Sequence, residues 1–297
     1  MSSQSLDISV RVGCRQTFAA PNPTVALLIV KPHHNKSQEV TQERFTLTPE
    51  KSGEEYQNEN GNTVYRVVFP PGETTIGHDA IVNVSSHLDN FGMSPRLESL
   101  SDVPTSVLRY TLPTRYCDSD TLIDLARSEF GSISPGVELV KAICDWTHRK
   151  IEYRAGIDSS TTMASQAIER GYGVCRDFAH VAIALCRCFD LPARYVSGHL
   201  ADIGRKSAGT PMDFHAYFEV YLGEWLTFDA RFNVPRIGRI KVAHGLDASD
   251  TAIATAYGEV PLQGFEVWAY QIDPKQVSVG DPVDLSKRLD GNEKVRH

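Results

Sequence analysis

Residues 171–186 of the chain read Gly-Tyr-Gly-Val-Cys-Arg-Asp-Phe-Ala-His-Val-Ala-Ile-Ala-Leu-Cys. The two glycines supply backbone freedom before an apolar run, in which large apolar residues recur at helical spacing from Phe178 to Leu185. This pattern predicts a buried helix that begins near Cys175. A thiol at a helix N-terminus faces the positive end of the helix dipole, which favours the nucleophilic thiolate. Without partners, such a cysteine is more often core packing.

A histidine and an aspartate follow Cys175 at a distance along the chain. His215 lies in residues 214–222, Phe-His-Ala-Tyr-Phe-Glu-Val-Tyr-Leu, which alternate between apolar and polar side chains. The alternation predicts a strand with one apolar face and one polar face, and it places His215 on the polar face. Asp229 ends the next run, Trp-Leu-Thr-Phe-Asp, after a turn around Gly223. The two runs therefore predict a hairpin.

The length of the turn decides whether the histidine and the aspartate can meet. If the turn contains two residues, Phe218 opposes Asp229, and the carboxylate lies on the apolar face, away from His215. A three-residue turn or a bulge shifts the pairing by one residue and exchanges the two faces. Tyr217 then opposes Asp229, and His215 lies diagonally across from the carboxylate, within reach of it. If Cys175, His215 and Asp229 form a catalytic triad, we predict an odd-length or bulged turn.

Cys, His and Asp in this order are typical of thiol acyl-transfer enzymes. The thiolate attacks a carbonyl carbon, the imidazole takes up and returns protons, and the carboxylate holds the ring in the useful tautomer. The candidate catalytic residues are therefore Cys175, His215 and Asp229. Asp213 competes for the last role, because it has the same strand parity as His215; it could orient the imidazole or meet the substrate. We expect the helix dipole and His215 to lower the thiol pKa, and Asp229 to raise the imidazole pKa.

Four segments of the chain resemble the transglutaminase-like superfamily, in particular its bacterial branch of cysteine proteases with an additional N-terminal β-domain. The segments are residues 173–180, 191–198, 213–216 and 227–231, within a resemblance that runs from about residue 8 to 270. The resemblance maps nucleophile, base and orienting acid onto Cys175, His215 and Asp229. It implies an α+β fold: an N-terminal β-sandwich, then a papain/transglutaminase-like core with the nucleophile at a helix N-terminus packed on an antiparallel sheet. Phe232 departs from the family pattern, in which a polar residue, often histidine, is common; this bears on substrate preference.

The first part of the chain has the rhythm of short strands separated by Pro, Gly and Asn clusters, which predicts a small β-sandwich. We expect its strands at residues 7–12, 25–30, 44–47, 63–69 and 79–84. Helical patterns follow at residues 121–130 and 137–150. Helices followed by strands predict an α+β catalytic domain. The expected domains are residues 1–112 and 113–297, with the boundary near Leu112-Pro113.

The composition excludes several classes of protein. The chain has 297 residues, 41% hydrophobic and 23% charged, which is typical of a soluble globular protein. A net charge of −7 argues against non-specific nucleic-acid binding. No stretch has the length of an apolar membrane span, and the N-terminus lacks the pattern of a signal peptide. The six cysteines form no CxxC pair, so a reducing cytoplasm is the expected location.

Several other residues have alternative interpretations. The backbone N–H of Cys175 is the expected first donor to a substrate oxyanion, and Tyr153 is a candidate for the oxyanion or substrate side, or else an aromatic anchor. His180 lies about 140° around the helix axis from Cys175, which favours packing. Asp177 lies in the first helical turn, where a carboxylate stabilises the helix. His33 and His34 lack a third ligand, so we expect no metal and no cofactor.

Three functions fit this set of residues. The first is a cysteine peptidase or amidase, in which water resolves the thioester. The second is acyl transfer to an amine, and the third is a binding module that keeps the fold without turnover. Hydrolysis is favoured slightly, because water is always present and transfer needs an acceptor site. The complete Cys-His-Asp set argues against the binding module. The expected partner is a peptide or protein amide substrate.

Overall fold

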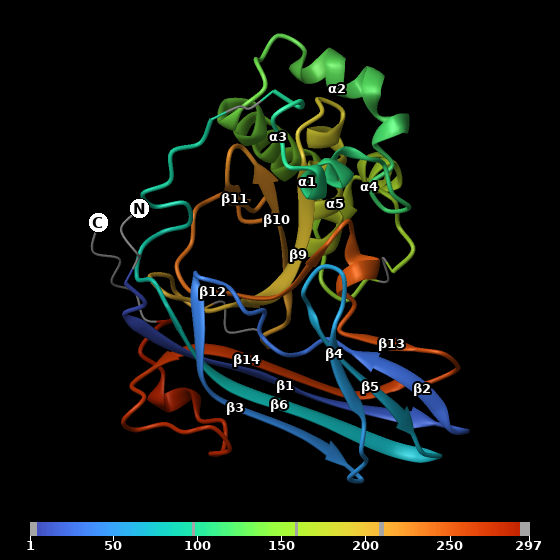
Figure 1. The fold of residues 1–297 in the computed structure, drawn as a ribbon, viewed down its shortest axis with the longest axis vertical. Coiled ribbons are helices and arrows are strands. Elements are labelled where there is room, and N and C mark those ends of the chain that lie inside the picture. Colours follow the sequence, from blue (N-terminus) through green and yellow to red (C-terminus); the bar gives the residue numbers. More distant parts are fainter. Residues whose placement is uncertain (1–4, 97–98, 158–159, 208–210, 292–297) are drawn as a thin grey trace.

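The computed structural model describes residues 5–96, 99–157, 160–207 and 211–291. Within these residues, two four-stranded antiparallel sheets pack face to face as a β-sandwich, in the lower half of Figure 1. One sheet has the order β14-β1-β6-β3 and the other β13-β2-β5-β4. The bounds are β1 (Ile8–Ala20), β2 (Thr24–Leu28), β3 (Gln38–Thr48), β4 (Glu54–Gln57), β5 (Thr63–Phe69), β6 (Gly72–Val84), β13 (Ala254–Ala256) and β14 (Leu262–Ile272).

The core of the sandwich comes from alternate side chains of both sheets. Phe18 and Ile76 of the first sheet share one buried cluster with Leu28 and Phe69 of the second, and the rings of Phe18 and Phe69 stack at 5.6 Å. Each strand expected from the sequence coincides with or overlaps one of β1, β2, β3, β5 and β6. The expected N-terminal sandwich is therefore confirmed.

Two strands of the sandwich come from the C-terminal part of the chain. β14 pairs with β1 from Ser9↔Ile272 to Phe18↔Leu262, and β13 pairs with β2. The expected division into residues 1–112 and 113–297 assigned both strands to the catalytic part, and the pairing corrects this assignment. The physical reason is that alternation reports which face of a strand is buried, whereas the identity of its pairing partner depends on segments far away in the sequence.

The second half of the molecule is built on the sheet β11-β10-β9-β12, with the helices on one side and the sandwich on the other (Figure 1). The expected helices at residues 121–130 and 137–150 are confirmed as α2 and α3. The helices are α1 (Thr105–Leu108), α2 (Ile123–Phe130), α3 (Val137–Lys150), α4 (Ala164–Arg170) and α5 (Cys175–Arg187). The strands are β7 (Glu152–Tyr153), β8 (Tyr172–Gly173), β9 (Ala193–Leu200), β10 (His215–Tyr221), β11 (Trp225–Phe228) and β12 (Arg239–Gly245). Short 3₁₀ turns lie at Arg109–Thr111, Ser119–Thr121, Ala248–Thr251 and Leu285–Lys287.

Helix α5 lies in the middle of the largest hydrophobic core. Every side chain from Asp177 to Arg187 is buried, and the helix contacts α3, α4, β9 and β10. Each large apolar side chain buried in this way contributes about 1.5–3 kcal/mol to stability. The packing therefore holds the first residue of the helix, Cys175, in a fixed position against the sheet.

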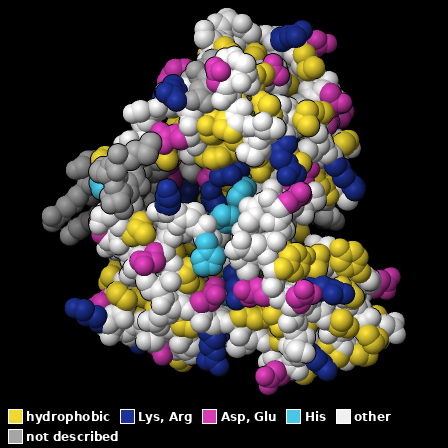
Figure 2. All heavy atoms as spheres, in the orientation of Figure 1, with side chains coloured by type: hydrophobic (Ala, Val, Ile, Leu, Met, Phe, Trp, Pro, Cys, Tyr) yellow, Lys and Arg dark blue, Asp and Glu magenta, His cyan; other side chains and the backbone are white. Residues whose placement is uncertain are grey.

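The other face of the sheet is polar, as its sequence predicts, but it is buried against the sandwich. Glu219 of β10 is paired with Arg194 of β9 and Lys241 of β12. The carbonyl oxygen of Lys241 accepts hydrogen bonds from the backbone N–H of His33 and the side chain of Gln38, each at 2.8 Å. Figure 2 shows His, Lys and Arg side chains gathered where the two halves of the molecule meet. The ion pairs of Glu219 thus link β9, β10 and β12 within the sheet that carries His215, and the hydrogen bonds of His33 and Gln38 to Lys241 join this sheet to the sandwich. No helix in the described part of the chain has the length and apolar character needed to cross a membrane.

Candidate active site

The position of Cys175 follows from the segment that precedes α5. Gly171 ends α4 in the left-handed conformation, at φ 73°, and Tyr172–Gly173 then pairs in parallel with β7. Val174 is extended, and α5 begins at Cys175, as predicted. The carboxylate of Asp177 accepts the N–H of Val174 at 2.8 Å. Asp177 therefore stabilises the start of the helix, as its place in the first turn indicated.

Gly173 lies where a side chain would displace Asp177. A Cβ at position 173 would lie 2.5 Å from a carboxylate oxygen of Asp177 and 2.6 Å from its Cβ. We expect Gly173→Ala to lower the free energy of unfolding by about 1–3 kcal/mol, as overpacking does, and to slow alkylation of Cys175 by iodoacetamide. Denaturant unfolding and alkylation rates measure both effects. Gly264→Ala is the control, because a Cβ there meets only ordinary contacts at 3.5 Å. Unchanged values for Gly173→Ala would show that Asp177 does not position the thiol.

The hairpin of β10 and β11 brings His215 and Asp229 together. Tyr221 pairs with Trp225 and Phe218 with Phe228, so the turn consists of residues 222–224. The predicted odd-length turn is confirmed. His215 Nε2 lies 2.7 Å from Asp229 Oδ2, and both side chains are buried. Because Nε2 is engaged by the carboxylate, Nδ1 is the ring nitrogen left for a nucleophile.

Asp229 is held in place by more than the histidine. Its other oxygen, Oδ1, accepts the backbone N–H groups of Arg231 at 3.0 Å and Phe232 at 3.1 Å. Arg239 of β12 forms an ion pair with Oδ2 at 3.0 Å. Burial alone would raise the pKa of Asp229, but the charges of His215 and Arg239 and these hydrogen bonds outweigh burial and hold the pKa well below its usual range. The carboxylate is therefore ionised at neutral pH.

Arg239 is itself oriented from a distant segment. Its Nε donates to Asp89 Oδ2 at 2.9 Å, in the segment between β6 and α1. Sequence reasoning missed Arg239 and Asp89, because neither lies in a motif. Asp213, the competing acid, is exposed, and its carboxylate accepts the N–H of Phe214 at 2.7 Å. The structure thus pairs His215 with Asp229.

The thiol of Cys175 is half-buried and interacts with the backbone N–H of Ala216, the residue after His215. This interaction places the start of α5 beside the start of β10. Burial raises the pKa of the thiol, although Ala216 and Arg231 act in the opposite direction. Burial also lowers the pKa of His215 more than Asp229 raises it. Both directions are the reverse of the expectation from sequence, because burial disfavours the charged form of each group. Burial thus favours the neutral thiol and the neutral imidazole over the ion pair.

Tyr153 lies beside the nucleophile segment and carries an arginine on its ring. Tyr153 pairs with Gly173 in the β7–β8 ladder, and 41% of its surface is exposed. The guanidinium of Arg231 lies 3.7 Å over its ring and 4.3 Å over the ring of Phe232. Arg231 was not singled out in the sequence, although its place two residues after Asp229 in the segment 227–231 was a usable signal.

His180 packs inside the protein, as predicted. Its Nε2 accepts the N–H of Ala248 at 3.2 Å, and its ring lies near the rings of Tyr116 and Tyr195. Burial lowers the pKa of His180 to about 3, so the ring is neutral at neutral pH. Across the described ranges, no group of three or more His, Cys, Asp or Glu side chains could hold a metal ion.

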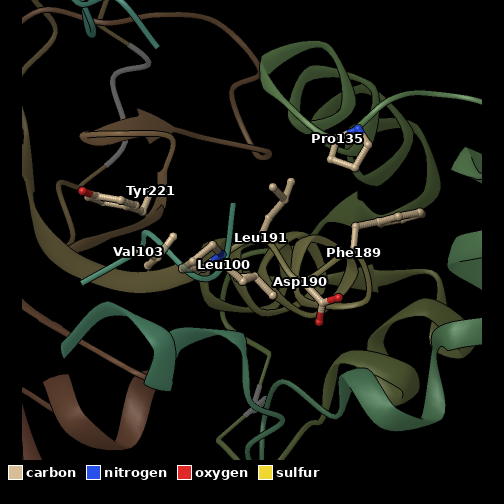
Figure 3. A pocket seen from close by; sticks show the side chains of 8 residues that line it. Leu100, Val103, Pro135, Phe189, Asp190, Leu191 and Tyr221 are labelled. Atoms are coloured by element: carbon tan, nitrogen blue, oxygen red, sulfur yellow. The ribbon is translucent and has the colours of Figure 1, made fainter. Parts of the chain in front are cut away.

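A cavity of about 210 Å³ lies at the other end of α5. Figure 3 shows its lining, which includes Leu100, Phe189, Leu191 and Tyr221. None of the candidate residues lines it, and Cys175 begins α5 whereas this cavity adjoins the residues that follow its end. The cavity is therefore separate from the candidate active site.

Comparisons with known proteins agree with this geometry. The family model of the transglutaminase-like superfamily matches residues 124–230. The crystal structure of a "putative cysteine protease" from Cytophaga hutchinsonii is 33% identical, with a TM-score of 0.82 over 91% of this chain and 92% of that chain. An uncharacterized protein of Mycobacterium leprae is 28% identical over 146 residues, which are 47% of this chain and 51% of that protein. An uncharacterized protein of Mycobacterium tuberculosis is 27% identical over 181 residues, which are 57% of this chain and 58% of that protein. The chain thus spans between half and three fifths of these curated relatives.

Proposed function

This chain belongs to the transglutaminase-like superfamily, and we propose that it is a thiol-dependent enzyme that hydrolyses peptide or protein amide bonds with Cys175, His215 and Asp229. The observation that carries the proposal is the 2.7 Å contact between His215 Nε2 and Asp229, together with the thiol of Cys175 at the N–H of the next residue, Ala216. These contacts support the proposed roles of a nucleophile, a base and an orienting carboxylate, because the acid holds the base.

The first half of the proposed reaction forms a thioester. As the sulfur of Cys175 attacks the amide carbonyl carbon, His215 Nδ1 takes up the thiol proton. The ionised Asp229 stabilises the imidazolium that results. The N–H of Cys175, at the start of α5, has no acceptor within the helix and suits the oxyanion. His215 then returns the proton to the leaving nitrogen, the C–N bond breaks, and the acyl group stays on sulfur.

The second half of the reaction releases the acyl group. Water attacks the thioester carbonyl carbon and gives a proton to His215, and the C–S bond breaks. The sulfur recovers the proton from the imidazolium, and a carboxylic acid leaves. Because burial favours the neutral forms of the thiol and the imidazole, we expect the charged pair to form during the attack, where Asp229 and the helix start stabilise it.

The test is activity profiling with a library of peptide amides, with and without added primary amines, in isotopically labelled water. We expect an acyl adduct on Cys175 by mass spectrometry and the oxygen label in the carboxylic acid product. A new amide formed with the added amine, without labelled acid, would replace hydrolysis by acyl transfer. If no adduct forms on Cys175 with any library member, the enzymatic proposal is wrong and the chain is a binding module.

A further inference from the structure

Arg231 is a cation beside the site that contacts two aromatic rings and has no ion-pair partner among the residues that the structure describes. The guanidinium of Arg231 lies 3.7 Å from the centre of the Tyr153 ring and 4.3 Å from the centre of the Phe232 ring. Contact with two aromatic rings orients the guanidinium and leaves its N–H groups available to a ligand. Among the described residues, this guanidinium forms no ion pair. The nearby carboxylate of Asp229, two residues earlier, is paired with His215 and Arg239 instead. Asp213 lies near enough for its charge to interact with that of Arg231, but the two side chains form no ion pair.

The backbone of Arg231 is tied to the catalytic carboxylate. Its N–H donates to Asp229 Oδ1 at 3.0 Å, and the other oxygen of that carboxylate contacts His215 at 2.7 Å. The positive charge of Arg231 also acts on the thiol of Cys175. The guanidinium is therefore fixed relative to both the base and the nucleophile, and it is partly exposed to whatever approaches them.

We propose that Arg231 binds a carboxylate of the substrate close to the carbonyl that Cys175 attacks, so that the enzyme selects amides with an anionic group beside the scissile bond. The planar guanidinium edge matches the two oxygens of a carboxylate and forms two parallel hydrogen bonds with it. This inference rests on the proposed function of Cys175 and adds the substrate class to it. Arg231 is a specificity residue, distinct from the groups that move protons.

A different role would be general stabilisation of the thiolate or the oxyanion by the positive charge. General stabilisation and carboxylate binding differ in whether they distinguish neutral from anionic reagents. General stabilisation speeds the reaction of neutral and anionic reagents alike, whereas carboxylate binding speeds only the anionic one. A pair of thiol reagents that differ only in this charge separates the two roles.

The test compares iodoacetate with iodoacetamide, which have nearly the same size. In both reactions the sulfur of Cys175 bonds to the methylene carbon, iodide leaves, and His215 takes the thiol proton. The measured quantity is the rate with iodoacetate divided by the rate with iodoacetamide, normalised to the same ratio for glutathione. A change in the thiol pKa cancels in this ratio. We expect the native ratio to exceed that of glutathione about tenfold, as one charge-assisted hydrogen bond allows. Arg231→Gln should return it to the glutathione value, and Arg231→Lys should retain part of the excess.

Arg154→Gln is the matched control. Arg154 also lies over an aromatic ring, that of Tyr172 at 4.3 Å, but it is paired with Glu152 at 2.7 Å. Its substitution should leave the ratio unchanged. A native ratio equal to that of glutathione, or an excess that persists in Arg231→Gln, would overturn the inference while leaving the proposed function intact. If neither reagent modifies Cys175 faster than Cys188, the proposed function fails instead.

A second measurement needs no variant and covers the case in which Arg231→Gln does not fold. At constant ionic strength, acetate should slow the alkylation of native Cys175 by iodoacetate, because acetate occupies the carboxylate site. Acetamide, its neutral counterpart, should not. Equal effects of acetate and acetamide would contradict a carboxylate site at Arg231.

Discussion

Cys175→Ala should abolish turnover of any amide substrate that the wild-type protein accepts, by a factor on the order of 10⁴ or more. Cys175 begins α5, which packs on β10, and alanine at this position has no nucleophilic atom to form the thioester. The fold should persist, because the substitution removes one sulfur atom from a half-buried position. Product formation measures the loss of turnover. The far-UV circular dichroism spectrum shows whether the fold persists.

The matched control for this substitution is Cys188→Ala. Cys188 follows the C-terminal end of the same helix and is also half-buried, with its thiol against the carbonyl oxygens of Ser119 and Ala184. Turnover in Cys188→Ala should stay close to wild type. Comparable activity in Cys175→Ala and wild type would rule out the thioester mechanism altogether.

Glu219→Gln should destabilise the protein by about 3–5 kcal/mol at neutral pH, as breaking a buried ion pair does. Burial alone would raise the pKa of Glu219, but the charges of Lys241 and Arg194 lower it to about 2, so the side chain is anionic at neutral pH. Glutamine has the same shape without the charge. Its introduction leaves two buried cations without a counter-charge, between the catalytic sheet and the sandwich.

The measurement is denaturant unfolding of both proteins at neutral pH. The control is Glu266→Gln, because Glu266 pairs with Arg15 on the surface, with side-chain exposures of 50% and 59%. An exposed pair of this kind contributes about 1 kcal/mol or less. If Glu219→Gln and Glu266→Gln unfold at the same denaturant concentration, the buried ion pairs of Glu219 do not stabilise the catalytic sheet.

The amino-acid sequence by itself determined the elements whose signal is local. The alternation of residues 214–222 predicted that His215 lies on the polar face. A pairing of His215 with Asp229 then required an odd-length or bulged turn, and the three-residue turn confirms it. The helical spacing after Gly173 predicted where α5 begins, and Val137–Lys150 was predicted to the residue. Such features depend on side-chain period and turn length, which neighbouring residues set.

The tertiary structure alone decided what depends on distant segments and on burial. β14 joins β1 across about 250 residues of chain. Arg239 reaches Asp229 from β12 and is oriented by Asp89 from a further segment; no local pattern marks these partners. Burial also reversed the expected pKa directions of Cys175 and His215. The reason is that loss of water disfavours a charge according to everything packed around it, and that packing is a property of the folded chain as a whole.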